Sequence, residues 1–463
     1  MSMRRENSSD NPVLHRMRLA GSVSGTHIAR ISAWEYALAL LYPLTQLVEV
    51  NVGGTFYGQD AAAILLLPIL ARGRSSTGLL RRASFFFAQI ALWLLGQIIT
   101  DLVRGTPFAD YSRGWSKIVF FSLQFAVLWL LLSRSPRLVA VYGLGLGVAY
   151  VLRAYTLSGA EAEYPWKFGL GAGIAMIGAS GGDLLSRRGR ALVLAPVALV
   201  AAAGLLALYH DARSTFGIAA LCAGYVFVLA RVFSKDQRKE PMNPARFAML
   251  AFLGVVFCHL AILGYSTLAL NGDLGEAAKR KYEDQARGDI NIIQAGRVES
   301  LVSTVAIADS PVLGHGSWAR NVGYVRLLAK KRAELGIPDV SGSEGYSDLI
   351  PSHSHILGAW VEAGIAGAIF WAWVLILCAG ALYRVHFLPA TAHATIVFSA
   401  FTLLWDVMFS PFGADQRFIR AFQIALMLQT FTRGRVAARL RELHRRGHTR
   451  GSLIMALRVP RSR

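Results

Sequence analysis

The sequence predicts an all-α integral membrane protein with about twelve transmembrane helices. The chain of 463 residues has 54% apolar and only 16% charged residues, and its mean hydropathy is +0.42. A soluble domain carries roughly 25% charged residues. Apolar stretches close to the roughly 20 residues that a helix needs to cross a hydrocarbon core recur along the chain. Together these features exclude an ordinary water-soluble domain.

The apolar stretches define the expected spans. In chain order they cover residues 33–50, 61–70, 85–100, 118–132, 138–152, 168–182, 191–209, 216–230, 247–265, 356–383, 394–409 and 418–431. Their spacing divides the chain into a first group of about nine helices (1–270), a loop domain (271–352), about three further helices (353–432) and a basic tail (433–463).

The placement of basic residues predicts the orientation. Most of the 48 Lys and Arg lie in segments that share one side with both termini, so that side is expected to be cytoplasmic. The formal net charge of +20 is then mainly a topology signal, and no basic soluble domain suggests nucleic-acid binding. The tail is expected to lie along the anionic membrane surface as an amphipathic helix.

The loop domain is the one long segment outside the expected spans, and it is predicted to lie outside the cytoplasm. Apolar residues at helical spacing predict helices over 276–309 and 321–336, separated by a glycine-rich turn. The second helix has an apolar face, as expected where a helix lies on the membrane or on the mouth of the bundle.

Two histidines stand at the boundary between this loop and the next span, in SHSHILGAWVEAGIAG (352–367). The helical period points His353 and His355 to different sides of the helix start. A neutral imidazole accepts a proton near neutral pH, so His353 could serve as a general base at the membrane surface. Alternatively, both residues cap the helix or lie at the lipid interface. HxH spacing is weak evidence for zinc, which usually needs an i, i+4 pair and a third ligand.

Glu362, Asp406 and Arg420 are ionisable residues inside expected spans, where a charge is costly and normally faces the bundle interior. Glu362 lies about 10 Å deeper than His353 at the helical rise. It could be a polar clamp between helices or a support for the site, and we favour the clamp. Asp406 and Arg420 are expected to pair between the last two helices.

Arginines near outer helix ends are candidates for anion binding. Arg213 is expected to begin a helix at the outer face, and Arg297 begins a loop helix. A guanidinium grips phosphate oxygens as a bidentate fork. Each arginine could instead snorkel or pair with a neighbour such as Asp211 or Glu299. Other arginines near outer helix ends resemble topology anchors: Arg104, Arg153, Arg417 and Arg420.

Three segments together resemble the O-antigen ligase and polymerase superfamily of bacterial envelope glycosyltransferases. HSHILGAWVEAGIAG is similar to the family pattern H-[N/S]-x-x-L-x-x-x-x-E-x-G-x-x-G, matched by His353, Ser354, Leu357, Glu362, Gly364 and Gly367. GRVESLVSTVAIADSPVLGHGS is similar to an arginine helix followed by P-x-x-G-x-G, matched by Arg297, Pro311, Gly314 and Gly316. ARSTFG is similar to a Ser-Arg-Gly-type helix start, although Arg213 precedes the serine.

The resemblance implies a GT-C-like polytopic glycosyltransferase of the Gram-negative inner membrane, with its site on the periplasmic side. The donor would be a glycan on undecaprenyl pyrophosphate, and in a ligase the acceptor would be a lipid A–core sugar hydroxyl. No metal, nucleotide sugar or other cofactor is implied. His353 would be the base, Arg213 and Arg297 would bind the pyrophosphate, and Glu362, His355 and Arg153 are supporting candidates.

Other functions remain open. Within the superfamily the alternatives are an O-antigen polymerase and a protein O-oligosaccharyltransferase, and one long loop before the histidine motif favours the ligase. From another class, a transporter of lipid-linked glycan would also need an outer cavity with arginines. A transporter would not need His353 as a base.

Overall fold

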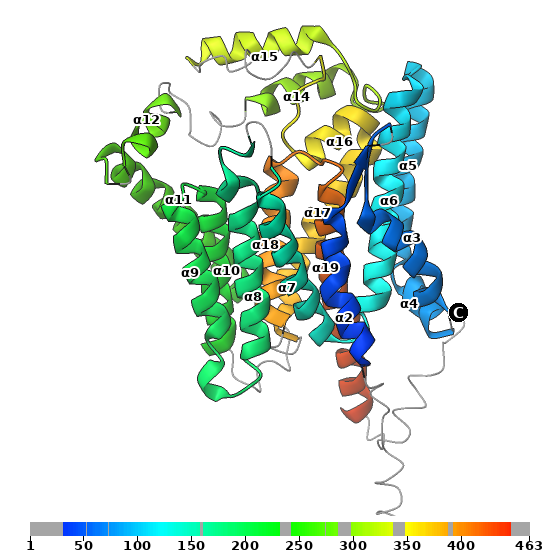
Figure 1. Cartoon of the computed structure of the whole chain (residues 1–463), viewed down its shortest axis with the longest axis vertical. Helices are drawn as coiled ribbons and strands as arrows, with labels where there is room; N and C mark the ends of the chain where they lie inside the picture. The colour runs from blue at the N-terminus through cyan, green and yellow to red at the C-terminus, as the bar shows by residue number, and fades with distance from the viewer. Residues whose placement is uncertain are drawn as a thin grey trace, which may run out of the picture.

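The computed structural model is a bundle of helices with one small β-hairpin (Figure 1). It describes residues 31–445 except 52, 73, 158–160, 232–241, 274, 286–297, 337–347 and 388–391. In the described part the two short strands β1 (Glu49–Asn51) and β2 (Thr55–Tyr57) pair antiparallel, and all other regular structure is helical. The chain is therefore an all-α fold apart from this hairpin.

The helices fall into two groups in chain order. The first group is α2 (Ala33–Leu41), α3 (Gly58–Ala71), α4 (Arg74–Arg82), α5 (Ser84–Arg104), α6 (Phe108–Leu132), α7 (Pro136–Ala154), α8 (Gly171–Leu185), α9 (Ala195–Tyr209), α10 (Arg213–Arg231) and α11 (Pro244–Leu270). The second group is α12 (Glu276–Gln285), α14 (Glu299–Asp309), α15 (Val322–Glu334), α16 (His355–Ala363), α17 (Ile365–Arg384), α18 (His393–Phe409) and α19 (Gln416–Arg445).

Seven helical segments in the described part are long and apolar enough to cross a membrane. They are α5, α6, α7, α10, α11, α17 and the segment Trp166–Leu185, which contains α8. A bent pair formed by α3 and most of α4 would make an eighth. The other expected spans fall on α2, on the shorter apolar helices α9 and α18, and on α19. The number of about twelve spans therefore stays a prediction.

The surface of the bundle is that of a membrane-embedded protein. Along α11 large apolar side chains face outward, including Phe252 at 66% and Val255 at 68% exposed. Soluble monomers rarely expose a contiguous apolar face of this kind, whereas lipid tails cover it at no cost. Aromatic rings pack together in the interior where α5, α6 and α17 meet, and the ring of Phe86 stacks on Phe125 with centroids 3.6 Å apart.

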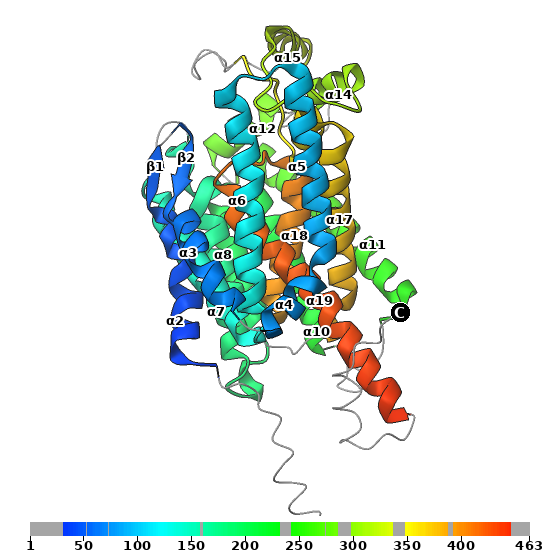
Figure 2. The ribbon, with the colours of Figure 1, turned by 90° about the vertical axis from the view of Figure 1, so that its right-hand side faces the viewer.

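Helices α14 and α15 lie across one end of the bundle, which we call the loop end (Figure 1). The expected helix over 321–336 is confirmed as α15, which Asn321 caps by accepting a hydrogen bond from the Gly323 amide. Tyr324 of α15 donates a 2.5 Å hydrogen bond to Asp309 at the end of α14. Burial, followed by this bond to a carboxylate, raises the pKa of Tyr324 to about 12. The hairpin β1–β2 stands on the flank of the bundle toward the same end (Figure 2).

Candidate functional site

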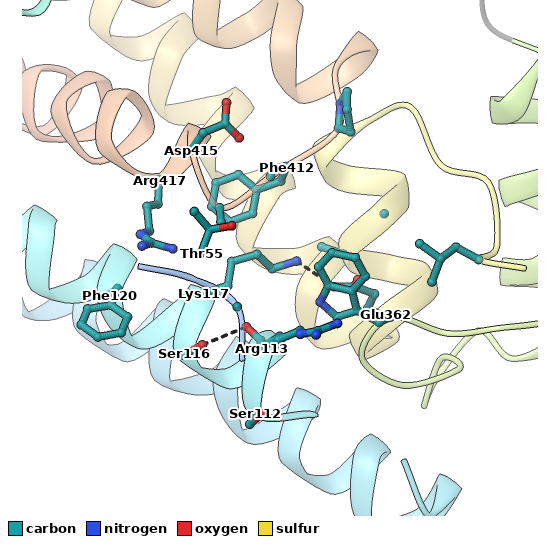
Figure 3. A pocket seen from close by; sticks show the side chains of 18 of the residues that line it. Thr55, Ser112, Arg113, Ser116, Lys117, Phe120, Glu362, Phe412, Asp415 and Arg417 are labelled. Carbon is teal, nitrogen blue, oxygen red and sulfur yellow. Dashed lines mark hydrogen bonds and ion pairs between the residues drawn. The ribbon is translucent and has the colours of Figure 1, made fainter. Parts of the chain in front are cut away.

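A cavity of about 1130 Å³ lies toward the loop end, where α6, α16, the β-hairpin and the segment joining α18 to α19 meet (Figure 3). Its volume is sufficient for a ligand of several rings. The aromatic lining residues are Phe56, Tyr57, Trp93, Phe108, Phe120, Trp318 and Phe412. The charged lining residues are Arg113, Lys117, Arg153, Arg417, Glu161, Glu362 and Asp415. The cavity thus combines flat apolar rings with charged hydrogen-bonding groups.

Helix α6 supplies one wall of this cavity. Arg113 and Lys117 are four residues apart, so they share one face of the helix, and Phe120 continues that face by about one turn. The Arg113 Nε donates a 2.8 Å hydrogen bond to the Gly53 carbonyl oxygen. This bond ties the turn of the β-hairpin to α6 and holds the hairpin against the cavity.

Arg417, in the first turn of α19, is held by a buried carboxylate. Its Nε donates to Asp60 Oδ1 at 3.0 Å, and its Nη2 donates to Asp60 Oδ2. The two side chains are 3% and 0% exposed, so this pair is shielded from water. Asp60 also accepts from the Tyr57 amide at the start of α3, and the guanidinium lies within 5.4 Å of the ring centroid of Phe120. Arg417 is therefore fixed at the cavity rather than loosely attached.

Two of the cavity arginines have only distant carboxylate partners. Arg153, in the last turn of α7, is 3.9 Å from Asp415, and Arg113 is 3.9 Å from Asp110. Neither separation is a hydrogen bond. The side chains of Arg153 and Arg113 are 26% and 37% exposed, so both can approach a ligand. Their charge is the part of the lining best suited to an anionic group.

Glu362 faces the same cavity from α16. Its Oε2 accepts a 3.0 Å hydrogen bond from Lys117 Nζ, which joins α16 to α6 (Figure 3). The two side chains are 21% and 13% exposed. Glu362 therefore combines the two roles considered from the sequence, because it bridges two helices and also lines the cavity.

The two sequence segments with the glycine motifs meet beside the cavity. The amides of His315 and Gly316 donate to the carbonyl oxygens of Val361 and Glu362 at 2.7 and 3.0 Å. Gly364 has φ of +61°, and a Cβ there would collide with the Val312 carbonyl oxygen. A Cβ on Gly314, where φ is +78°, would lie 2.6 Å from the Gly364 amide nitrogen. These two glycines are needed because the backbones touch.

Helix α5 holds the first of these segments in place. The Ser317 amide and hydroxyl donate to the buried carboxylate of Asp101 at 2.6 and 2.7 Å. Arg104 Nη2 donates to the Gly314 carbonyl oxygen at 2.8 Å, and Trp115 Nε1 donates to Asp101 at 2.8 Å. Arg104 is thus an internal brace in this structure.

His355 lies outside the cavity in a group that we call the closed cluster: His355, Arg420, Asp406, Gln416 and Gln423. Arg420 Nε donates to His355 Nε2 at 3.0 Å, and the other ring nitrogen, Nδ1, is 2.5 Å from the Ser410 carbonyl oxygen. Because Nε2 accepts a hydrogen bond, the proton is on Nδ1 and the imidazole is neutral. Arg420 also binds Asp406 at 2.7 Å, which confirms the expected pair. These contacts favour a positioning role for His355.

His353 lies between Ser352, which lines the cavity, and Ser354, which caps α16. The Ser354 Oγ accepts from the Leu357 amide at 3.3 Å and donates to the Val407 carbonyl oxygen at 2.8 Å. His353 is half-buried, whereas His355 is fully buried. The backbone that carries His353 is therefore fixed at the edge of the cavity, although the imidazole is not among the lining residues.

Of the two predicted pyrophosphate ligands, Arg213 and Arg297, the structure describes only Arg213. Arg213 begins α10, as expected, but its Nε lies 3.2 Å from Asp211, and its guanidinium lies over the ring of Tyr265. It is not among the residues that line the cavity. Arg297 falls in 286–297, outside the described residues. Arg153, the third arginine considered, does line the cavity.

Several cavity residues were not identified from the sequence. Arg113 and Lys117 offered one signal in the sequence, because they are one helical turn apart directly before the expected span 118–132. Trp318, and Asp60 buried behind Arg417, carried no such signal. Their roles depend on contacts with residues far away in the chain.

The comparisons with known proteins assign no family. No protein-family model matches the chain, and a search of curated proteins finds no match. In the described residues no group of three or more His, Cys, Asp or Glu side chains is arranged to hold a metal ion. The fold and the cavity therefore define a helical membrane protein with a charged, aromatic-lined cavity.

Proposed function

We propose that this protein is a glycosyltransferase that moves a glycan from undecaprenyl pyrophosphate to a sugar hydroxyl of lipid A–core. The observation that carries the proposal is the position of the cavity, which lies where the histidine and glycine motif segments meet. It offers guanidinium groups for an anionic leaving group and aromatic rings for sugars. A location in the inner membrane, with the cavity on the periplasmic side and both termini in the cytoplasm, is part of the proposal.

The proposed reaction is a single displacement. The acceptor oxygen attacks the anomeric carbon as His353 removes its proton, and the bond from that carbon to the pyrophosphate oxygen breaks. The undecaprenyl pyrophosphate leaves with the bonding electron pair, and one attack from the opposite face inverts the anomeric centre. The reaction needs a base on the acceptor side and positive charge on the leaving-group side.

Within the cavity, Arg153 is suited to bind the leaving pyrophosphate, and Arg417, already held by Asp60, places a fixed guanidinium beside it. Both lie near Tyr57, with their guanidinium carbons 5.6 and 5.3 Å from its ring centroid. Fixed positive groups stabilise charge that develops in the transition state without reorganising. Arg213 and Arg297 remain predicted ligands on the basis of the family resemblance.

The test uses purified protein with a lipid-linked glycan, lipid A–core and EDTA, and it follows the glycan-capped product on a gel. We expect the wild type to form product and His353→Gln to lose roughly 10²- to 10⁴-fold in rate. His210→Gln is the matched control, because His210 is exposed and stacks on Trp166 with centroids 4.0 Å apart. Equal rates for His353→Gln and the wild type would remove His353 as the base.

The same assay distinguishes the alternatives. Product with lipid-linked repeat units but not lipid A–core would identify a polymerase, and product with a pilin acceptor would identify a protein transferase. If no acceptor is glycosylated, a liposome assay of lipid-linked glycan movement tests the transporter. A transporter should keep most of its rate when His353 is replaced by Gln.

A further inference from the structure

Trp318 lines the cavity in an unusual backbone conformation. Of the described non-glycine residues, only Asp211 and Trp318 have positive φ, and the value at Trp318 is +52°. Side chains rarely adopt this region because Cβ approaches the following carbonyl oxygen. Such strain persists where the surrounding structure enforces it, and it is concentrated at functional sites.

The backbone on both sides of Trp318 is held by hydrogen bonds. Ser317 is 1% exposed and donates to Asp101 through both its amide and its hydroxyl. On the other side, the Ala319 carbonyl oxygen accepts a 2.9 Å hydrogen bond from the Ile350 amide. Between these anchors the indole is 37% exposed and lines the cavity. The fold therefore keeps a large aromatic ring accessible instead of packing it into the core.

The Arg113 guanidinium lies over this ring. Its guanidinium carbon is 5.7 Å from the ring centroid of Trp318, while its Nε is held by Gly53. Ser112 and Glu362 line the same cavity and add hydroxyl and carboxylate groups. A flat aromatic face beside planar charged groups suits a pyranose, whose C–H face stacks on a ring while its hydroxyls bind the charged groups.

We propose that Trp318, with Arg113 beside it, is a stacking platform for a pyranose ring of the glycan that this protein handles. The inference rests on the proposed function and deepens it by assigning a sugar subsite. Its ligand is defined by the pyranose ring itself, which either the donor glycan or the acceptor core could supply.

Helix α6 shows how far this platform lies from Arg417, which is near the proposed pyrophosphate position. Arg113 is beside Trp318, and Phe120 is beside Arg417. Seven residues of helix separate Arg113 from Phe120, a rise of about 10 Å. That is longer than one sugar ring. The platform therefore holds a sugar other than the one attached to the pyrophosphate.

The test measures binding of two water-soluble probes to the detergent-solubilised full chain by saturation-transfer NMR and calorimetry. One probe is the core oligosaccharide released from lipid A by mild acid, and the other is the glycan released in the same way from its lipid carrier. We expect Trp318→Gly to weaken one probe by roughly 3- to 10-fold and Trp318→Tyr to retain affinity within about 2-fold. The probe that is weakened identifies the source of the stacked sugar.

Folding is controlled in two ways. Glycine adopts positive φ freely, so Trp318→Gly keeps the local backbone conformation, and a melting temperature close to that of Trp318→Tyr shows that weaker sugar binding is not a loss of folding. Trp34→Gly is the matched control, because Trp34 is 49% exposed on α2 and does not line the cavity. It should leave the affinity for both probes unchanged.

The outcomes also separate this inference from the proposed function. Unchanged affinity of Trp318→Gly for both probes, or no binding of either probe to the wild type, overturns the platform whether or not glycan transfer occurs. Binding that depends on Trp318 in a protein that transfers no glycan supports the platform and counts against the transferase. Binding that depends on Trp318 together with transfer supports both.

Discussion

The cavity and the closed cluster use the same kinds of residue but differ in how fully those residues are bonded. In the closed cluster, Arg420 is 2% exposed and donates to His355, Gln416 and Gln423 while also pairing with Asp406. In the cavity, Arg153 is 26% exposed and its carboxylate partner is 3.9 Å away. Arg420 directs four of its five N–H donors to protein groups, whereas Arg153 has no carboxylate at hydrogen-bonding distance.

This difference separates a structural group from a binding group. A saturated, buried guanidinium holds helices together, whereas one with distant partners still gains free energy when a ligand anion arrives. Arg417 is intermediate, because Asp60 fixes it while it still lines the cavity. Replacing residues of the closed cluster should mainly reduce stability, and replacing residues of the cavity should mainly reduce function.

The largest effect is expected from Arg420→Met. Removing this buried guanidinium takes the charged partner from the Asp406 carboxylate, which is 14% exposed, and the donor from buried His355, which together cost about 3 kcal/mol of unfolding free energy. Unfolding of the detergent-solubilised protein by SDS measures it. The control is Arg153→Met, which should cost no more than about 1 kcal/mol because its ion pair is long and partly exposed. A larger loss for Arg153→Met than for Arg420→Met would contradict the comparison.

For function the order reverses. Arg153→Met should lower the glycan-transfer rate by roughly 10²- to 10³-fold, the usual cost of one positive or donor group at the developing charge. Arg213→Met should cost less, since Arg213 pairs with Asp211 and does not line the cavity. Initial rates at saturating donor measure both. If Arg213→Met is the more damaging variant, the pyrophosphate lies near α10 instead.

The ion pair between Lys117 and Glu362 tests whether a residue that joins two helices also contributes to glycan transfer. A double-mutant cycle with Lys117→Met and Glu362→Gln should give a coupling of roughly 0.5–1.5 kcal/mol in unfolding free energy. The transfer rate of Glu362→Gln should fall by less than about 10-fold, because His353 would remain in place as the base. A coupling near zero would mean that the 3.0 Å pair contributes no stability.

The sequence predicted most of the helices because lipid requires long apolar segments with internally bonded backbones. Seven of the expected spans fall on segments that meet the length and hydropathy of a membrane helix. It could not say which arginines face the cavity. Arg417 and Arg420 are three residues apart in α19, yet one pairs with Asp60 and the other with Asp406. That difference depends on α3 and α18, which hydropathy does not position.

The sequence identified the motif segments but not the single residues that matter within the fold. The glycines of the two motif segments meet through close backbone contact, which no spacing within either segment predicts. Trp318 could not be identified from the sequence, because it stands out by its positive φ and a tryptophan side chain does not predict that conformation. Sequence patterns thus indicate which segments matter, and packing decides which side chains in them are accessible.

The smallest expected effect comes from Tyr324→Phe. This variant is a reference for the comparison of cavity and closed cluster, because its hydrogen bond is neither deeply buried nor in the cavity. Losing the bond to Asp309 should cost about 0.5–1 kcal/mol of unfolding free energy at neutral pH, with no change in transfer rate. Because the folded-state pKa of Tyr324 is raised to about 12, this stabilisation is complete below the ordinary tyrosine pKa near 10 and is lost as pH rises through 12. Wild type and variant should therefore converge in stability over that interval.

A difference that persisted above pH 12 would show that the hydroxyl acts through packing instead of through the bond. A change in transfer rate would mean that the α14–α15 contact shapes the cavity and is not an independent brace.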